Sequence, residues 1–391
     1  MNDLKISISG VRGIVGESLT SGIILDLATA FGTYILTNTP SQKEKKVAIG
    51  MDSRLSGDVI SQLIIATLRA CGIHVLDLGL IPTPTVLFTV RELGLAGGLI
   101  VTASHNPKEW NGLKFVSPRG TFLRQDEWDE VYHIYTTKKF KYESYKHLGQ
   151  VQPYHEAANE HIQKVLSFIQ IEKIKEKRFK VAYDPCNGAG SHITRLLLEQ
   201  LGCEVYGIHT DSNKEFERSP EPIPSNIKKL EKYVVENGCD IGFAIDPDAD
   251  RVAIVSEKGQ AIGEEYTLAI AVEHYLKAFN AHTSLAVNIS TSRMIDDIAG
   301  NHGVKLHRTA VGEINVVQAM FDENCEIGGE GNGGVIIPEI NSGRDSLVAM
   351  TMALSALATE DISLSVMIQG FKDYHFVKDK VETGKLNTKR I

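Results

Sequence analysis

The stretch KVAIGMDSRLSGDVISQLIIATLRACGIHVLDLG, residues 46–79, decides the fold of this chain. An apolar strand over 46–52 is followed by a polar loop, by a helix with apolar periodicity over 61–70, and by a second strand over 71–79. Two strands joined by a helix form a βαβ unit, in which the strands run parallel and the crossover is right-handed. The stretch therefore predicts an α/β domain built on parallel strands.

The same plan recurs twice further along the chain. The second unit begins at FKVAYDP (179–185) and the third at TSLAVNIS (283–290). The helical runs of the three units end at or near Gly72, Gly202 and Gly303, where a left-handed C-cap is expected. Chance similarity among common βαβ units is the alternative, and we favour true repetition. The sequence therefore predicts three tandem, related α/β domains with mixed, largely parallel sheets.

Changes in composition give the boundaries of these domains. The Lys- and Tyr-rich segment 136–150 has no clear apolar period, 171–180 is charged, and 256–266 resembles a hairpin turn. We expect domains over residues 1–150, 151–256 and 257–370, followed by a short remainder over 371–391.

Composition excludes several classes of protein. The 391 residues are 42% apolar and 23% charged, which is ordinary for a globular protein. Asp and Glu (49) outnumber Lys and Arg (41), and the net charge of -8 argues against binding of nucleic acid through a basic surface. A membrane helix needs about 20 apolar residues in succession, and no stretch approaches that length. We therefore expect neither nucleic acid nor a membrane among the partners.

The N-terminus and the cysteines indicate a cytoplasmic protein. The first residues, MNDLKIS, lack the basic flank and the apolar run of a secretory signal. The five cysteines are odd in number and form no CxxC pair, so free thiols in a reducing cytoplasm are the simplest interpretation and a zinc site is not expected. These cysteines are Cys71, Cys186, Cys203, Cys239 and Cys325.

The first motif with chemistry is VTASHNPKEWNGLKF, residues 101–115. It begins where the apolar strand GGLIV (97–101) ends, and open α/β sheets place ligands just past the carboxyl ends of strands. Ser104 is therefore a candidate nucleophile or phosphoryl carrier. A plain turn of Ser, Asn and Pro is the alternative. His105 is a further candidate catalytic residue, although its place beside Ser104 is no evidence of a catalytic triad.

The second motif is IGFAIDPDADRVAIV, residues 241–255. Asp246, Asp248 and Asp250 stand at every second position after an apolar strand, where their charges repel each other unless a cation gathers them. A hard divalent ion such as Mg2+ suits oxygen ligands of this kind. A solvated acidic turn is the alternative, and the neighbouring Arg251 argues mildly against it.

The third motif is IGGEGNGGVIIPEINSGRDS, residues 327–346. Its glycines match the GxGxxG spacing, but a strand follows them rather than the helix of a dinucleotide-binding loop. Glu330 and Asn332 in this loop offer hydrogen-bond acceptors and donors that suit sugar hydroxyls. A structural bend is the alternative.

Two arginines are candidates for binding anions. In SISGVRGIVG (7–16), three glycines surround Arg12, and one arginine in a flexible loop suits bidentate phosphate binding. Arg54, in GMDSRLSG (50–57), also follows a strand and either binds an anion or caps local carbonyl groups. A simple glycine turn is the alternative for the first loop.

Taken together, these motifs resemble the α-D-phosphohexomutase family, which contains phosphoglucomutases, phosphomannomutases and phosphoglucosamine mutases. The TASHNP, Asp-x-Asp-x-Asp-Arg, Gly-Glu-x-x-Gly and N-terminal VRG loops occur here in the order of the family. NGLKF, FERSPEP (216–222) and TAVGE (309–313) fit as well. The resemblance covers about residues 5–375, and the combination of motifs is highly specific.

The resemblance implies a role for the residues around the serine. Ser104 is the phosphoserine, and one of its oxygens joins the three aspartates as a ligand of Mg2+. Arg12, Lys114 and Arg251 stabilise the transferring phosphoryl group and assist proton movement. Arg251 and Arg54 also count among the candidate substrate-binding residues.

The resemblance further implies the substrate and the reaction. Glu330 and Asn332 bind sugar hydroxyls, and the loop at Gly312 contacts the sugar from the third domain. The serine donates its phosphoryl group to a small-molecule sugar phosphate, and the hexose 1,6-bisphosphate so formed turns over in a central cleft before it returns the other phosphoryl group. This bisphosphate is the intermediate and the activator. The oligomeric state is left open.

Two departures from the family pattern affect these expectations. Most bacterial members have Gly-Glu-x-Ser-Gly-His, and Asn332 and Gly334 here replace the serine and a candidate proton-transfer histidine, as in archaeal-like members. The family's fourth domain carries an Arg-x-Ser-Gly-Thr phosphate loop, which does not occur in these residues. We therefore expect the fourth domain to be essentially missing apart from a remnant over 371–391, and mutase turnover of this chain to be weak or absent.

The function predicted from the sequence is that of a phosphohexomutase, and we favour phosphoglucosamine mutase. The alternatives are a phosphoglucomutase or phosphomannomutase, and a weakly active or inactive truncated form that only binds sugar phosphate. A metal-dependent phosphatase that hydrolyses the phosphoserine is a third class.

Overall fold

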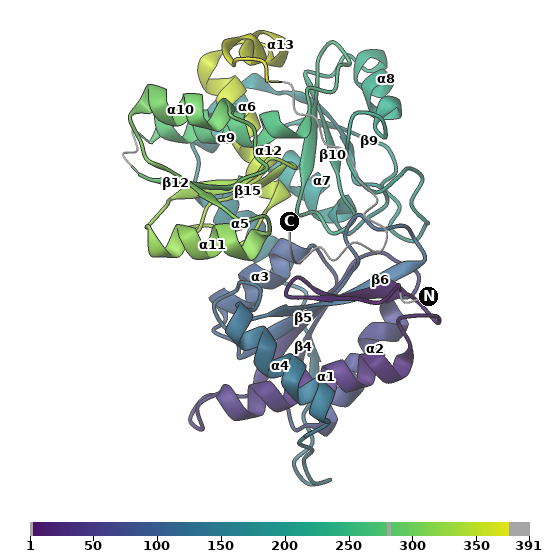
Figure 1. Cartoon of the computed structure of the whole chain (residues 1–391). Helices are drawn as coiled ribbons and strands as arrows, with labels where there is room; N and C mark the ends of the chain where they lie inside the picture. The colour runs from purple at the N-terminus through teal and green to yellow at the C-terminus, as the bar shows by residue number, and fades with distance from the viewer. Residues whose placement is uncertain (1–2, 280–282, 375–391) are drawn as a thin grey trace, which may run out of the picture.

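The computed structural model describes residues 3–279 and 283–374 and contains three sheets, each covered by helices. In Figure 1 the first domain lies below the other two, with the second at the upper right and the third at the upper left. This arrangement confirms the predicted fold class of three α/β domains with mixed, mostly parallel sheets.

The first domain is built on a seven-stranded sheet of order β1-β2-β6-β5-β3-β4-β7. Apolar residues of α1, α2 and α4 pack on one face of this sheet, and those of α3 pack on the other. The elements are β1 (Lys5–Ser7), β2 (Gly10–Ile14), α1 (Ser21–Asn38), β3 (Lys46–Met51), α2 (Gly57–Ala70), β4 (His74–Leu80), α3 (Thr83–Glu92), β5 (Gly97–Val101), β6 (Trp110–Val116), α4 (Gln125–Thr137) and β7 (Val151–Pro153).

The second domain has a four-stranded sheet of order β11-β10-β8-β9. Its helix α8 covers one face, and α5 and α7 belong to the core on the other. The elements are α5 (Ala157–Ser167), α6 (Ile171–Lys177), β8 (Lys180–Asp184), α7 (Gly190–Gln200), β9 (Glu204–Gly207), α8 (Lys228–Glu236), β10 (Ile241–Ile245) and β11 (Val252–Ser256).

The third domain repeats this plan with the order β13-β12-β14-β15. Helix α11 covers one face, while α9, α10 and α12 pack in the core that this domain shares with the second. The elements are α9 (Glu264–Ala278), β12 (Leu285–Asn288), α10 (Met294–His302), β13 (Leu306–Thr309), α11 (Glu313–Asp322), β14 (Ile327–Glu330), β15 (Gly334–Ile336), α12 (Ser346–Glu360), α13 (Leu364–Met367) and the 3-10 helix η1 (Ile368–Gly370).

The three sheets contain the same four-strand unit, which confirms the predicted repetition. The orders β6-β5-β3-β4, β11-β10-β8-β9 and β15-β14-β12-β13 correspond, and in each unit the first strand is antiparallel while the other three are parallel. Gly72, Gly202 and Gly303 follow the three crossover helices with φ of +81°, +77° and +65°, the left-handed conformation expected of them.

This repetition determines where the functional loops lie. In each unit one hairpin loop joins the antiparallel strand to its neighbour. The serine motif lies between β5 and β6, the aspartates between β10 and β11, and Glu330 at the end of β14, before β15. Equivalent places in three repeats therefore present the three motifs.

The second and third domains share one continuous hydrophobic core. At its centre lies α12, which is buried from Ser346 to Ala358. Among the described residues no single helix is long and apolar enough to cross a membrane, and α12 passes such a test only together with the segment 364–370, across a bend of 86°. The buried surroundings of α12 identify it as a core helix.

The structure differs from the sequence analysis at two domain ends. Strand β7 pairs with β4 in the first sheet, so that sheet extends past the boundary expected at residue 150. At the C-terminal end, Phe371 stacks edge-on against Tyr266 and the Tyr374 hydroxyl donates to Asp297 at 2.7 Å, so both residues pack on the third domain. Residues 375–391, the main part of the expected remnant of a fourth domain, lie outside the described residues.

Candidate active site

The serine loop holds Ser104 in a backbone conformation that non-glycine residues rarely adopt. Its φ is +51°, and its N–H donates to Thr102 Oγ1 at 2.8 Å. The Ser104 hydroxyl is buried and donates to Asp246 Oδ2 at 3.3 Å, although 142 residues separate the two in the sequence. His105 Nδ1 lies 3.4 Å from the same hydroxyl, at the long end of hydrogen-bond range. The strained turn therefore aims the hydroxyl at the aspartate loop.

Arg54, a predicted substrate-binding residue with capping of carbonyl groups as the alternative, contacts the backbone of this loop. Its Nε donates to Asp52 Oδ2 at 3.1 Å, and the side chains of both residues are fully buried. Its two terminal nitrogens donate to four carbonyl oxygens of the serine loop at 2.5–2.9 Å. All five donors of the guanidinium are thus used within the protein. The carbonyl groups are those of Ser104, Asn106, Pro107 and Trp110.

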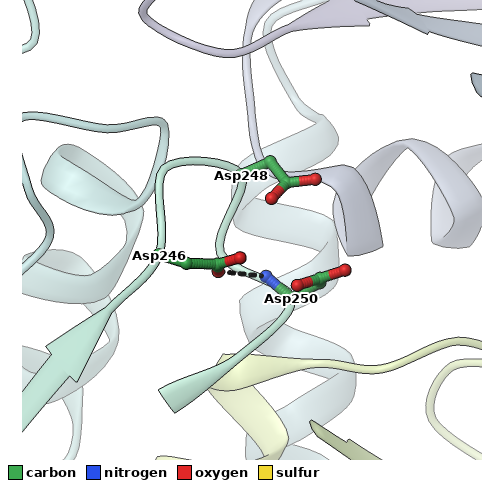
Figure 2. A group of neighbouring side chains, drawn as sticks. All are labelled: Asp246, Asp248 and Asp250. Atoms are coloured by element: carbon green, nitrogen blue, oxygen red, sulfur yellow. Dashed lines mark hydrogen bonds between the residues drawn. The ribbon is translucent and has the colours of Figure 1, made fainter. Parts of the chain in front are cut away.

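The three aspartates lie together in the loop between β10 and β11 (Figure 2). Each has a carboxylate oxygen that accepts hydrogen bonds from neighbouring residues. Asp246 Oδ1 accepts hydrogen bonds from the backbone N–H groups of Asp250 and Arg251, both at 3.1 Å. Asp248 Oδ2 accepts from Thr83 Oγ1 and Lys114 Nζ, both at 2.7 Å. The bond from Arg344 Nη2 to Asp250 Oδ2 measures 2.5 Å.

The remaining oxygens fit a divalent cation. Asp248 Oδ1 and Asp250 Oδ1 are buried and have no hydrogen-bond partner among the described residues, and one oxygen from each of the three carboxylates lies within 4.8 Å of the others. Burial, followed by the charges of Asp250 and Asp248, raises the pKa of Asp246 well above its usual value. Buried carboxylate oxygens that lack partners are the ligands that Mg2+ prefers, so the residues present suit such an ion.

Cationic side chains of the first domain approach the aspartates from the neighbouring strands. Lys114 on β6 is buried, and its Nζ lies 2.7 Å from Asp248 Oδ2 and 3.7 Å from Asp250 Oδ2. Arg12 on β2 pairs in register with Gly112 of β6 and donates to Asn106 Oδ1 of the serine loop at 3.4 Å. Burial lowers the pKa of Arg12, and Asp248 and Asp250 oppose that effect.

Two more predicted residues adjoin this group. Arg251 Nε lies 3.6 Å from Asp250 Oδ1, so its charge faces the aspartate site from the second domain. Burial, together with the charges of Arg251 and Arg12, lowers the pKa of His105 to about 3. His105 is therefore neutral near pH 7 and carries no charge into the site.

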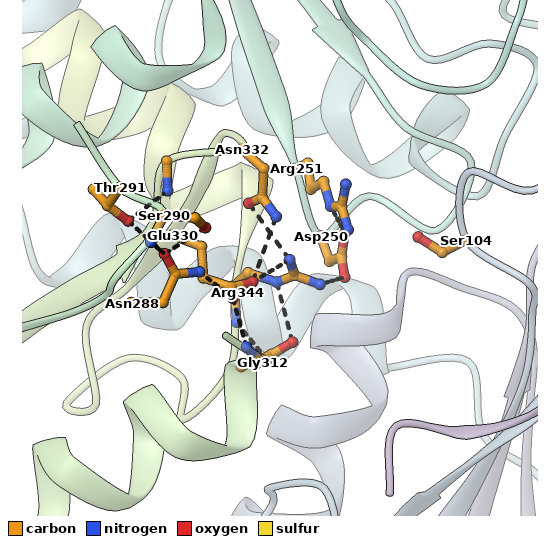
Figure 3. A network of polar contacts seen from close by, with 12 residues as sticks. Ser104, Asp250, Arg251, Asn288, Ser290, Thr291, Gly312, Glu330, Asn332 and Arg344 are labelled. Atoms are coloured by element: carbon orange, nitrogen blue, oxygen red, sulfur yellow. Dashed lines mark hydrogen bonds and ion pairs between the residues drawn. The ribbon is translucent and has the colours of Figure 1, made fainter. Parts of the chain in front are cut away.

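The predicted sugar-binding residues gather in the third domain, around Glu330. Its Oε1 accepts from Asn288 Nδ2 at 2.6 Å and from the backbone N–H of Gly312 at 3.3 Å. Its Oε2 accepts from Arg344 Nη1 at 2.6 Å and from Asn332 Nδ2 at 3.5 Å. Figure 3 shows how Arg344 lies between this group and Asp250, with Ser104 on the far side of the aspartate loop.

Three residues in these networks were not singled out from the sequence. Thr83 orients Asp248, Asn288 holds Glu330, and Arg344 joins Asp250 to Glu330. Asn288 is the last residue of the strand LAVN, and Asp52 follows the strand KVAIGM at the equivalent place. Alignment of the repeats therefore points to Asn288. Thr83 and Arg344 lie in no repeated pattern, and their partners are far away in the sequence. The chemical roles of all these residues remain predictions.

Comparisons with known proteins agree with this arrangement. Family models for the α/β/α domains I, II and III of phosphoglucomutase/phosphomannomutase match residues 4–142, 159–259 and 264–374. Over 95% of its length the chain is 33% identical to a phosphoglucomutase/phosphomannomutase of Thermococcus kodakarensis, of which it covers 81%. It is 31% identical, over 95% of its length and 81% of the relative, to a phosphoglucosamine/phosphogalactosamine mutase of Sulfurisphaera tokodaii.

Solved structures show the same fold. A phosphoglucomutase/phosphomannomutase family protein from Burkholderia thailandensis superposes with a TM-score of 0.82 at 25% identity, over 94% of this chain and 81% of that one. A more distant relative, N-acetylphosphoglucosamine mutase of Aspergillus fumigatus in complex with GlcNAc-6P and magnesium, gives a TM-score of 0.58 at 12% identity, over 94% of this chain and 79% of that one.

Proposed function

Since the chain belongs to the α-D-phosphohexomutase family, whose members are intramolecular phosphotransferases, we propose that it converts hexose 6-phosphate and hexose 1-phosphate into one another through a phosphoserine at Ser104. The observation that carries this proposal is the 3.3 Å contact between Ser104 Oγ and Asp246 Oδ2. It joins a buried hydroxyl to a cluster of carboxylates suited to a divalent cation.

The reaction balances within the enzyme and its substrate. A sugar hydroxyl attacks the phosphorus of phosphoserine, the bond from phosphorus to Ser104 Oγ breaks, and the sugar becomes a bisphosphate. The hydroxyl proton passes to a base of the site. Ser104 Oγ takes up a proton from an acid of the site as it leaves. The bisphosphate then presents its other phosphoryl group, and Ser104 Oγ attacks that phosphorus and gives its proton to a base of the site. The bond between that phosphorus and the sugar oxygen breaks, the sugar oxygen takes up a proton, and the isomeric monophosphate is released with phosphoserine regenerated. Transfer of this kind depends mainly on positioning and charge stabilisation.

Asp246, Asp248 and Asp250 are the residues that would hold Mg2+, together with an oxygen of phosphorylated Ser104. The cation would supply charge for the transferring phosphoryl group. The fungal relative with magnesium supports the choice of metal. Thr83 and Lys114 fix Asp248, and Arg344 fixes Asp250, so the protein itself orients the carboxylates.

Positive side chains supply the rest of the charge balance. A phosphoserine brings about -1.5 to -2 charges to a site that already holds three aspartates. Arg12 lies beside the serine loop, and Lys114 and Arg251 lie beside Asp250. From these places they stabilise the phosphoryl group in transfer. We do not include Arg54 in this set, because its terminal nitrogens donate hydrogen bonds to four backbone carbonyl groups of the loop. It holds the loop that carries the phosphoserine.

Glu330, Asn332 and Gly312 are proposed to bind the sugar, and we favour glucosamine phosphate as the substrate. The loop GEGNGG offers an amide and a carboxylate rather than a histidine. The Sulfurisphaera tokodaii relative supports an amino sugar, whereas the Thermococcus kodakarensis relative supports glucose or mannose phosphate as the alternative.

A coupled assay tests the proposal. The full chain is incubated with Mg2+, a catalytic amount of hexose 1,6-bisphosphate and the 6-phosphates of glucosamine, glucose and mannose in turn. We expect slow formation of the 1-phosphate, in keeping with the weak turnover predicted from the sequence, with the highest kcat/KM for glucosamine. Ser104→Ala is expected to lose a further factor of about 10³. Ser117→Ala, which removes a buried hydroxyl bonded to Thr121, is the matched control. Full activity of Ser104→Ala, or release of inorganic phosphate without isomerised sugar, contradicts the proposal.

A further inference from the structure

One guanidinium, that of Arg344, is shared by carboxylates of two domains (Figure 3). Nη2 donates to Asp250 Oδ2 in the second domain at 2.5 Å. Within the third domain, Nη1 donates to Glu330 Oε2 at 2.6 Å and Nε donates to Glu313 Oε2 at 3.1 Å. Arg344 is 7% exposed, so these contacts are made away from water. Its guanidinium hydrogen-bonds directly to both Asp250 of the aspartate site and Glu330 of the proposed sugar site.

The path of this side chain depends on the absence of a side chain at Gly334. Gly334 on β15 is the cross-strand partner of Glu330 on β14. A Cβ placed on Gly334 would lie 2.2 Å from Arg344 Cδ and 2.7 Å from Arg344 Cγ. The stem of Arg344 therefore runs directly over Gly334 to reach Glu330, and any residue with a Cβ at position 334 forces Arg344 to move.

The backbone of Arg344 is fixed as firmly as its side chain. Its N–H donates to Glu313 Oε1 at 2.9 Å, so Glu313 holds the main chain and the side chain together. The next residue, Asp345, caps helix α12 through bonds to Leu347 and Val348. The same loop reaches the first domain, where Asn341 Nδ2 donates to the carbonyl oxygen of Pro84 at 2.8 Å. Arg344 thus stands at the junction of all three domains.

The charges show that the carboxylates compete for this one cation. Asp250, Glu330 and Glu313 are all buried, and each accepts a hydrogen bond from a different nitrogen of the same guanidinium. One guanidinium therefore serves three buried carboxyl groups. Whatever neutralises one carboxylate leaves more of the guanidinium charge to the others.

We propose that Arg344 is a positioning residue that couples the occupancy of the aspartate site to the binding of sugar phosphate at Glu330. The proposal rests on the proposed function for the identity of the two ligands. Asp250 offers Oδ1 to a cation while its Oδ2 is held by Arg344. A cation at Oδ1 weakens the attraction of Asp250 for Arg344, and the guanidinium then binds Glu330 more strongly and fixes its orientation for sugar hydroxyls. Linkage requires the reverse effect to be equal.

The test is a thermodynamic cycle on the unphosphorylated full chain. The dissociation constant of glucosamine 6-phosphate is measured by calorimetry with and without Mg2+, and that of Mg2+ is measured with and without the sugar phosphate. We expect Mg2+ to tighten sugar-phosphate binding in the wild type, by about fivefold or more. In Arg344→Lys one ammonium cannot reach both carboxylates as the guanidinium does, so this factor falls at least about threefold.

Two further variants separate the proposed role from others. Direct attraction between Mg2+ and the substrate phosphate is the same in wild type and Arg344→Lys, so the lost part of the factor belongs to Arg344. Gly334→Ala changes no charge, yet it displaces Arg344 and is expected to lose the coupling too. Gly300→Ala, whose Cβ meets nothing within 4 Å, is the matched control and keeps the coupling.

The outcomes distinguish this inference from the proposed function. A coupling factor in Arg344→Lys equal to that of the wild type, or no coupling in the wild type, overturns the role of Arg344 even where the enzyme isomerises sugar phosphates. Absence of isomerisation and of phosphoserine in the wild type overturns the proposed function itself. If Gly334→Ala does not fold, Arg344→Lys decides alone, with its melting temperature as the check on folding.

Discussion

At the scale of single residues, the hydroxyl of Thr83 shows how one domain orients a carboxylate of another. Thr83, at the start of α3, donates to Asp248 Oδ2 at 2.7 Å, and its backbone N–H donates to the carbonyl oxygen of the same aspartate at 2.9 Å. The other oxygen, Asp248 Oδ1, is left buried and without a hydrogen-bond partner among the described residues. Partners that orient a ligand in this way commonly contribute to metal affinity.

Thr83→Val is therefore expected to weaken Mg2+ binding by about tenfold, because Asp248 loses one of the two side-chain partners that orient it. Titration of the metal-free protein by calorimetry measures the change. Thr89→Val is the matched control: Thr89 is buried on the same helix, but its hydroxyl bonds only to the carbonyl oxygen of Thr85. An equal loss of Mg2+ affinity in both variants would show that the contact with Asp248 has no special role.

Arg54→Lys tests the support of the serine loop. A lysine has at most three donors on one nitrogen and cannot reach Asp52 and four carbonyl groups together. We expect a loss of about 2–3 kcal/mol in the free energy of unfolding and a fall in kcat with little change in KM. Urea unfolding and steady-state kinetics measure both. Arg69→Lys, at an exposed arginine with one bond to Gly149, should change neither. A raised KM with unchanged stability would restore Arg54 as a substrate-binding residue.

Arg54 also shows where prediction from sequence ends at this scale. In the sequence, an arginine that binds a ligand cannot be told from one that caps carbonyl groups when both follow a strand. Both interpretations of Arg54 were therefore open. The structure favours the second, because four carbonyl groups of the loop 104–110 accept hydrogen bonds from its guanidinium. The role of Arg344 was equally hidden, since it depends on a missing side chain at Gly334 and on a carboxylate 94 residues away.

At the scale of elements, the repeated unit accounts for what the sequence did predict. The strands β3, β8 and β12, which begin the three units along the chain, end in or just before Asp52, Asp184 and Asn288. In each case the side-chain Oδ1 accepts the N–H of the residue two positions on, at 3.0, 2.9 and 3.0 Å. Strand, helix and glycine positions are local patterns, so they could be read from the chain. The meeting of the three loops follows from the shared topology and not from any one motif.

The packing of α9 against α12 gives a pH-dependent stability. His274 on α9 is 6% exposed, and its Nε2 lies 2.8 Å from Ser355 Oγ on α12. Burial lowers the pKa of His274 to about 4. Between pH 6.5 and 4 the unfolded chain binds a proton that the folded chain does not, so the free energy of unfolding falls as the pH falls through this range.

His274→Gln removes this titration and keeps a group that can bond to Ser355. We expect the wild type to lose about 2 kcal/mol from this histidine between pH 6.5 and 5, and the variant to lose correspondingly less. Urea unfolding at a series of pH values measures the slope. His192→Gln, at an exposed histidine of α7, is the control and keeps the slope of the wild type. The same slope in all three proteins would assign the acid sensitivity to other groups.

At the scale of the whole molecule, the cluster of Asp246, Asp248 and Asp250 lies where the domains meet. Asp248 is bound by Thr83 and Lys114 of the first domain, and Asp250 by Arg344 of the third. A second junction lies nearby, where Arg91 of α3 donates to the carbonyl oxygens of Pro338 and Ile340. We therefore expect a ligand that binds at the aspartates to affect the packing of all three domains, and not only the loop that carries the aspartates.

Mg2+ is expected to stabilise the folded chain as a whole. At a concentration of 100 times the dissociation constant, binding to the folded state alone adds about 2.7 kcal/mol to the free energy of unfolding. Thermal unfolding with Mg2+ and with excess EDTA measures the effect, and Asp250→Asn, which loses a ligand, should respond much less. A melting temperature that is unchanged by Mg2+ in the wild type would argue against a cation at this site.

The most direct test of the central claim is phosphopeptide mass spectrometry of the full chain after incubation with hexose 1,6-bisphosphate and Mg2+. We predict one phosphoryl group on Ser104, which passes to the sugar as bisphosphate when hexose 6-phosphate is added. A chain that carries no phosphoryl group on Ser104, or one that keeps it after the monophosphate is added, would contradict the account.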